Sequence, residues 1–591
     1  MKKTLFTLLL FFTLLLYADV FSYDFGEHRD IGDRAFTQFI SQLIREGFFK
    51  DTTEAVDFFE SYLNMKYSKT ENSLYFLDLT HEPNKVTYGV LNGLSGDHEE
   101  NPESVRDNLN YKYSILNQIL FLHNKFMAEF QHESPNSEIL SIDPSFAYLA
   151  VTDFSHFYDY GKSLRYHLEQ LERSDLILLK SPSGIPEVFG RLKKITSLGK
   201  YVTLHTFAVY LAELAGKYYS SDTARSKAYF FYAFLYSAFA DHFLEDCFAS
   251  GHIVVNRSIF NAIINNKGLH DFYNKTGLQV MNLNGNIWKT YGDHNLNKPD
   301  ENWRRLKDYA DIKIITVTPK EQIVIDAVTL SLNEIWTGFY KFRNDTANNS
   351  YPVHILDLVP GQKERLQSFC LEHFAALKLI PVPFDSDLDE YKLNKKDLPT
   401  LKRVNSLIEN RNFVRSRVAN SFMLELGSLN TFSLSGTEDD VSLFGLRFNL
   451  SAQFYKYNDT RNKGGTFDNW FGLTGSFNMG YNRNWKPVMR QYKAGGYYNG
   501  DFWVSKRRYI GVFSYIEVGL QNKDDLNKAM FSPSLGLQLG PLLGLDDFSL
   551  PRWLWIPIQM IVLPLKLMIN LNVVPGQMPA YNLFGEIDLI L

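Results

Sequence analysis

The chain has 591 residues, more than one hydrophobic core usually serves, so we expect two or more domains. Its formal net charge of −5 gives no electrostatic basis for a dedicated nucleic-acid surface. The two cysteines, Cys247 and Cys370, allow one disulfide but exclude a disulfide-rich scaffold.

The first residues are typical of a secretory signal peptide. Lysines precede an apolar run from Leu5 to Leu16, which is too short to cross a bilayer comfortably. Cleavage could follow Ala18 or Ser22, and we assign residues 1–22 to the signal peptide. We therefore expect an exported protein.

From about residue 25 to residue 343 the spacing of apolar residues is helical. Residues 200–219 and 225–248 carry apolar side chains three and four apart, and the second run is apolar nearly all round, as in a helix at the centre of a bundle. A further helix is expected at about 319–342. We interpret residues 23–345 as an all-α helical bundle. Residues 346–417, rich in proline and charge, are interpreted as a connector with little core of its own.

After residue 418 the period of the pattern changes to two. In residues 446–454 apolar and polar side chains alternate without exception, and similar runs lie at 471–482, 509–520, 534–540, 565–573 and 581–591. About eight strands fit in residues 418–591, so the fold class is α + β with a C-terminal antiparallel β-domain. We predict an outer-membrane β-barrel, because the runs approach the roughly 9–11 residues that a membrane strand needs. The alternative is a soluble lipid-binding β-sandwich.

The strongest chemical signal ends the most apolar helical run. His242 and Asp246 are four residues apart and therefore share a helix face. Gly251 can end the helix and let His252 turn back toward that face. Because imidazole and carboxylate together suit zinc, these residues predict half of a metal site.

The stretch from Ala228 to Asn256 resembles the central helix of the bacterial zinc-dependent phospholipases C and the fungal single-strand nucleases. In that family a His, an Asp four residues later and a His six residues after that bind zinc. Other segments fit in the same order: His28 resembles the ligand on the family's first helix, Asp97 its carboxylate loop, and His156 its His-Phe-Tyr-Asp segment. The resemblance covers about residues 23–345. The zinc ligands that it implies are His28, Asp97, His156, His242, Asp246, His252 and His270.

The chain departs from the family at one position. Four residues after His270 the family has a carboxylate, whereas this chain has Asn274. The neighbouring Asp271 could serve instead. Tyr23, the first residue after cleavage at Ser22, could also bind metal, since the family's mature N-terminus can do so.

The resemblance implies an exported zinc-dependent phosphodiester hydrolase with two or three zinc ions, in which a metal-activated water attacks the substrate. Asp246 would bridge two metals, and Asp97 would be the catalytic residue that orients or deprotonates the water. We expect a phospholipid substrate, because the chain is exported, acidic and followed by a module that looks membrane-oriented.

Two other functions remain open. One is a single-strand nuclease, and the other is a non-catalytic outer-membrane or surface protein that retains structural metals, which Asn274 favours. A barrel would place the helical domain in the periplasm of a Gram-negative-type bacterium, and the alternative location is secretion.

Overall fold

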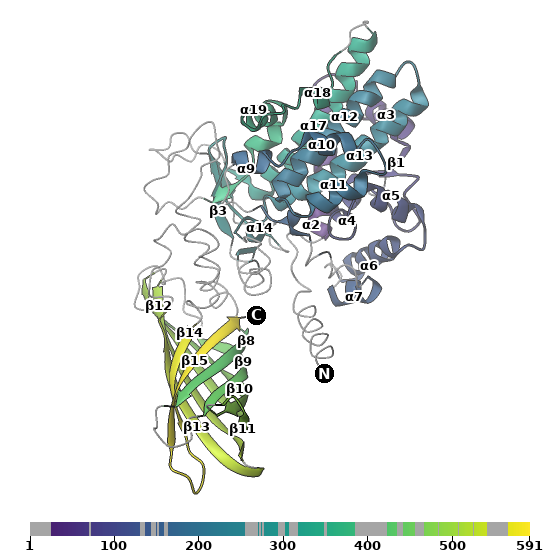
Figure 1. The fold of residues 1–591 in the computed structure, drawn as a ribbon. Helices are drawn as coiled ribbons and strands as arrows, with labels where there is room; N and C mark the ends of the chain where they lie inside the picture. The colour runs from purple at the N-terminus through teal and green to yellow at the C-terminus, as the bar shows by residue number, and fades with distance from the viewer. Residues whose placement is uncertain are drawn as a thin grey trace. The chain divides into compact units, whose positions relative to one another are not determined.

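The computed structural model describes two compact units (Figure 1). One comprises residues 1–257 and 273–401, and the other residues 258–272 and 402–591; we call them the helical unit and the β unit. The structure describes residues 25–69, 73–130, 136–143, 149, 153–158, 164–254, 270, 273–274, 277–292, 302–305, 317–347, 352–383, 422–433, 441–455, 466–482, 484–505, 508–523, 525–539 and 565–590. The predicted signal peptide, Tyr23 and Asp271 lie outside these residues.

The helices of the helical unit are α2 (Phe25–Arg45), α3 (Thr52–Leu63), α4 (Tyr88–Leu94), α5 (Pro102–Asn110), α6 (Ile115–Phe130), α7 (Asn136–Ile142), η1 (Phe154–His156), α9 (Leu164–Leu168), α10 (Arg173–Leu178), α11 (Ile185–Leu192), α12 (Ser197–Tyr218), α13 (Thr223–Asp246), α14 (Ser250–Val254), α17 (Lys320–Ala347), α18 (Ile355–Leu358), α19 (Lys363–His373) and η2 (Ala375–Lys378). Its strands are β1 (Met65–Ser68), β2 (Ser73–Phe76), β3 (Leu278–Met281), β4 (Asn286–Thr290), β5 (Asn302–Arg305), β6 (Val317–Pro319) and β7 (Val382–Pro383). No helix among the described residues is long and apolar enough to cross a membrane.

Helix α13 lies at the centre of the helical unit, as its apolar sequence predicts. It begins after Asp222, whose side chain accepts a hydrogen bond from the Arg225 backbone N–H, and its last residues are completely buried. Helices α12 and α17 pack on it. Gly216 of α12 allows α12 and α17 to approach each other closely, since a Cβ there would collide with the backbone carbonyl of Phe339 on α17. The bundle thus buries the end of α13, where the predicted ligands lie.

Helix α2 packs just as closely on α4. A Cβ on Gly89 would collide with the carbonyl of Arg29, and one on Gly32 would meet the Gly89 Cα at 2.8 Å. The tight contact places His28, completely buried on α2, beside the end of α13.

Two features of the helical unit differ from the expectation. Residues 352–383 pack within it and bury Leu366, Phe369 and Cys370, so this part of the expected connector belongs to a core. The sheet β6-β5-β4-β3-β7 was not predicted either, because strands of two to five residues carry no readable alternation.

Both cysteines are buried free thiols.

The β unit contains eight antiparallel strands. They are β8 (Phe422–Ser433), β9 (Ser442–Tyr455), β10 (Thr466–Tyr481), β11 (Pro487–Ser505), β12 (Arg508–Lys523), β13 (Leu526–Gln538), β14 (Leu565–Asn572) and β15 (Ala580–Ile590). Strand β15 pairs with β8 and β8 with β9, so the order β10-β11-β12-β13-β14-β15-β8-β9 closes as a barrel (Figure 1). The expected α + β organisation, helical first and antiparallel β second, is confirmed.

The alternation in the β unit points the apolar side chains outward. On β9, Leu446 is 67% exposed whereas its neighbour Arg447 is 2% exposed. On β10, Leu473 is 68% exposed and Thr474 5%. The polar face of these strands is therefore the buried one.

Candidate metal centre

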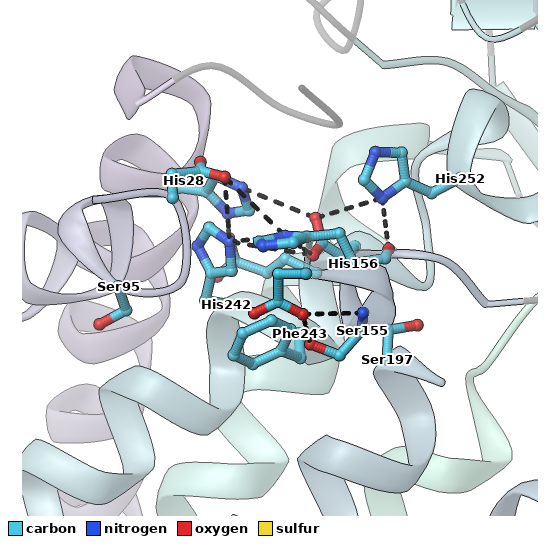
Figure 2. Close-up of polar contacts among 12 residues, drawn as sticks. His28, Ser95, Ser155, His156, Ser197, His242, Phe243 and His252 are labelled. Carbon is cyan, nitrogen blue, oxygen red and sulfur yellow. Dashed lines mark hydrogen bonds and ion pairs between the residues drawn. The ribbon is translucent and has the colours of Figure 1, made fainter. Parts of the chain in front are cut away.

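Two groups of potential metal ligands meet at the end of α13. One comprises His28, His242 and Asp246, the other Asp97, His156 and His242; all are buried, and the ligand atoms of each group lie within 4.8 Å of one another. His242 belongs to both groups. Figure 2 shows His28, His156 and His242 turned toward one another, with His252 beside them.

The ring orientations of His242 and His28 are fixed by contacts on the side of each ring that faces away from the cluster. The His242 Nδ1 lies 3.1 Å from the Asn92 carbonyl oxygen, which leaves Nε2 facing the cluster. The His28 Nδ1 lies 2.6 Å from Glu245 Oε2, and its Nε2 lies 3.9 Å from Asp246 Oδ1. Metal-binding histidines usually use one nitrogen for a backbone carbonyl or carboxylate in this way, so that the other is presented to the ion.

Both rings are neutral at physiological pH. Burial, together with the neighbouring His156, lowers the pKa of His28 to about 3. Burial lowers the pKa of His242 well below its ordinary value, and His28 adds to the effect. Neutral imidazole is the form that binds metal.

His156 stands among the carboxylates. Its Nδ1 lies 2.9 Å from Asp246 Oδ2, 3.8 Å from Asp97 Oδ1 and 3.4 Å from His242 Nε2. Burial lowers its pKa, but the attraction of Asp246 and Asp97 outweighs burial and raises it above the ordinary value. This position therefore favours a positive charge, which a proton or a metal ion could supply.

The residues present fit a metal such as zinc. Three imidazoles and two carboxylates converge in a buried space, and the mixture of nitrogen and oxygen donors is one that zinc accepts.

The other implied ligands do not join these two groups. The His252 Nδ1 lies 3.7 Å from Asp246 Oδ1, and it also contacts the His156 carbonyl oxygen. His270 is buried and belongs to residues 258–272, which fall outside the helical unit.

Asn274 has a structural role in place of the family's carboxylate. Its Oδ1 accepts hydrogen bonds from the Gly251 backbone N–H at 2.6 Å and from the Ser250 hydroxyl at 3.2 Å. The amide therefore holds the start of α14, which carries His252.

Sequence reasoning missed the residues behind the ligands. Glu245 and Asn92 hold His28 and His242, and Lys200 with Asp153 holds the turn before His156. For Glu245 a signal existed, because it precedes a candidate ligand on a helix that is otherwise apolar. For Lys200 none did, since its partners lie more than 40 residues away.

No family model, curated protein sequence or solved structure matches this chain.

Proposed function

We propose that the helical unit is a zinc-dependent phosphodiester hydrolase of the phospholipase C type. The observation that carries the proposal is the pair of three-ligand groups joined at His242. The order of His28, Asp97, His156, His242 and Asp246 along the chain, which resembles that of the zinc phospholipases C, supports the same proposal. In this arrangement the two groups would hold two zinc ions, and Asp246 presents one carboxylate oxygen toward His28 and the other toward His156.

The residues of the chain have separate tasks in this proposal. Zinc, when bound, polarises a phosphoryl oxygen and lowers the pKa of a water molecule. Asp97 is the residue that orients or deprotonates that water, because its carboxylate lies 3.8 Å from His156 Nδ1 and 3.9 Å from His242 Nε2 at the edge of the cluster. Glu245 and Asn92 keep His28 and His242 aimed at the ions.

The β unit supports a membrane location and a lipid substrate. Its outward side chains include Leu446, Leu473, Ile516 and Leu535, each at least 60% exposed, whereas Glu517 is completely buried. A polar interior and an apolar exterior are the pattern of an outer-membrane barrel, and a soluble β-sandwich has the reverse. We propose that the chain is exported and anchored in an outer membrane, and that its substrate is a phospholipid.

The test compares two substrates under one condition. Purified protein, reconstituted and supplied with zinc, is assayed for release of phosphocholine from phosphatidylcholine and for degradation of single-stranded DNA. We expect lipid cleavage to dominate. DNA cleavage alone would make the chain a nuclease, and bound zinc with neither activity would make it a non-catalytic metal protein.

Replacement of the proposed catalytic carboxylate sharpens the test. Asp97→Asn should lower kcat by about 10²–10⁴-fold, as expected when a group that transfers a proton is lost. Asp107→Asn is the matched control, because Asp107 is 65% exposed and pairs only with Arg106 among the ion pairs described. Equal activity of the two variants would remove Asp97 from the mechanism.

A further inference from the structure

A lysine is buried beneath the candidate metal centre. Lys200 of α12 is completely inaccessible to solvent, and its Nζ lies 3.8 Å from the centre of the Phe243 ring, next to His242 in the chain (Figure 2 labels Phe243). Burying an ammonium group costs several kcal/mol unless it is paired and hydrogen-bonded. The partners of Lys200 therefore indicate what it does.

Both hydrogen-bond partners of Lys200 belong to the short turn that presents His156. Its Nζ donates to Asp153 Oδ2 at 3.1 Å and to Ser155 Oγ at 2.9 Å. Asp153 is the N-cap of η1, and its other oxygen accepts from the Ser155 backbone N–H at 2.9 Å. Lys200 thus holds the cap and the middle residue of a three-residue turn whose last residue is His156.

The turn is short, and contacts from outside it contribute to its conformation. A single 3₁₀ turn has poor hydrogen-bond geometry and does not persist alone. Backbone contacts hold its two sides, since the Phe154 N–H donates to the Lys193 carbonyl and the Tyr158 N–H to the His252 carbonyl. Within the turn, Lys200 Nζ joins the side chains of Asp153 and Ser155, which are also bonded to each other.

We propose that Lys200 is a positioning residue of the metal centre: it locks the Phe154–His156 turn and thereby sets the metal affinity of the group formed by Asp97, His156 and His242. The inference rests on the proposed zinc site. It goes beyond that proposal because it assigns to one of the two groups a support that the other lacks. His28 is held by Glu245 instead, and Lys200 makes no described contact with it.

Zinc affinity measured by competition with a chelator tests the inference. Lys200→Met keeps the length of the side chain and removes its donors. We expect about 10–100-fold weaker binding of one zinc ion, the usual cost of losing a group that supports a ligand, and unchanged binding of the other. Unchanged affinity for both ions would overturn the inference.

A second variant separates positioning from folding stability. Lys200→Met leaves Asp153 buried without its cation, so stability should fall, and Lys200→Met with Asp153→Asn should recover it. The double variant still lacks the lysine's hydrogen bonds, so its zinc affinity should stay low. If affinity recovered together with stability, Lys200 would be a structural residue only.

Glu213→Gln is the matched control on the same helix. Glu213 is also buried and accepts hydrogen bonds from the Ile355 backbone N–H, far along α12 from Lys200. It should lower stability and leave both zinc affinities as they are.

Hydrogen exchange in metal-free protein tests the inference even if the proposed function fails. Lys200→Met should speed exchange of the Ser155 and His156 amides at least tenfold, and Glu213→Gln should not. Wild-type protein that binds no zinc would refute the proposed function, while slow exchange in Lys200→Met would refute the role of Lys200.

Discussion

The helical unit and the β unit bury opposite kinds of side chain. The helical unit buries phenylalanines from several helices, such as Phe36, Phe39 and Phe234, and gathers its candidate metal ligands at the end of α13. The β unit buries polar residues along its strands and exposes leucines and isoleucines. The strands whose side chains are described show the same alternation as in a water-soluble sheet, but the faces are exchanged.

The buried charges also find different partners in the two units. In the β unit they pair with one another: Arg447 lies 3.2 Å from Glu517 and 3.1 Å from Glu586. In the metal centre, histidines and carboxylates face a shared space, and the charge balance favours a cation. A closed network of ion pairs stabilises an interior, whereas converging ligands leave room for an ion. The comparison supports the proposal that chemistry belongs to the helical unit and anchoring to the β unit.

The largest effect is expected when both His242 and Asp246 are replaced. His242→Ala with Asp246→Ala should abolish most zinc binding, because both groups include His242 and one includes Asp246. The thermal stabilisation by zinc should disappear with it. Elemental analysis of dialysed protein measures the zinc.

His205→Ala is the control for that experiment. His205 is equally buried in the same bundle, but it lies 2.6 Å from Glu334 and belongs to neither ligand group. It should retain zinc. Full zinc content in the His242 and Asp246 double variant would refute the centre.

Because the apolar side chains of the β unit face outward, a charged side chain on its outer face should lower its stability. Leu473→Arg, in the middle of β10, should destabilise the reconstituted protein by about 2–4 kcal/mol if lipid surrounds the strand. Leu526→Arg is equally exposed but lies at the first residue of β13, where the cost should fall to about 0–1 kcal/mol. Urea unfolding in phospholipid vesicles measures both. Identical stability of the two variants and the wild type would argue against a membrane barrel.

The sequence predicted the elements that carry a long regular pattern. The apolar run 225–248 became α13 (Thr223–Asp246), and the nine alternating residues 446–454 fall within β9 (Ser442–Tyr455). It also found His242 and Asp246, because a spacing of four fixes a helix face. These features are local, so a single sequence contains them.

Contacts between distant segments could not be predicted in the same way. The carbonyl of Asn92 aims His242, and any residue at position 92 has a carbonyl. Lys200 meets Asp153 because α12 packs against the turn η1, which is distant in the sequence. The short strands β3 to β7 form because they pair with one another. Each is too short to show a period in the sequence.

A pH effect is expected in the helical unit, because it contains buried histidines such as His123. Burial, helped by His98 and Arg29, lowers the pKa of His123 well below its ordinary value. A histidine with a lowered folded-state pKa takes up its proton only on unfolding, so it costs stability as the pH falls below about 6.5. His123→Phe keeps the stacking on Phe25 and removes this cost. Between pH 7 and pH 5 the metal-free wild type should lose about 2 kcal/mol more than the variant in urea unfolding; parallel losses would mean that His123 is protonated in the folded state.

The smallest expected effect concerns the departure from the family pattern at Asn274. Asn274→Asp, which supplies the carboxylate, should not create a third zinc site, because the side chain is turned toward the Gly251 N–H and the Ser250 hydroxyl. The aspartate oxygen can accept the same two hydrogen bonds, so stability should change by less than about 1 kcal/mol. Zinc stoichiometry, measured beside the wild type, should be the same for both proteins. A gain of one zinc ion would show instead that position 274 supplies a metal ligand once it carries a carboxylate.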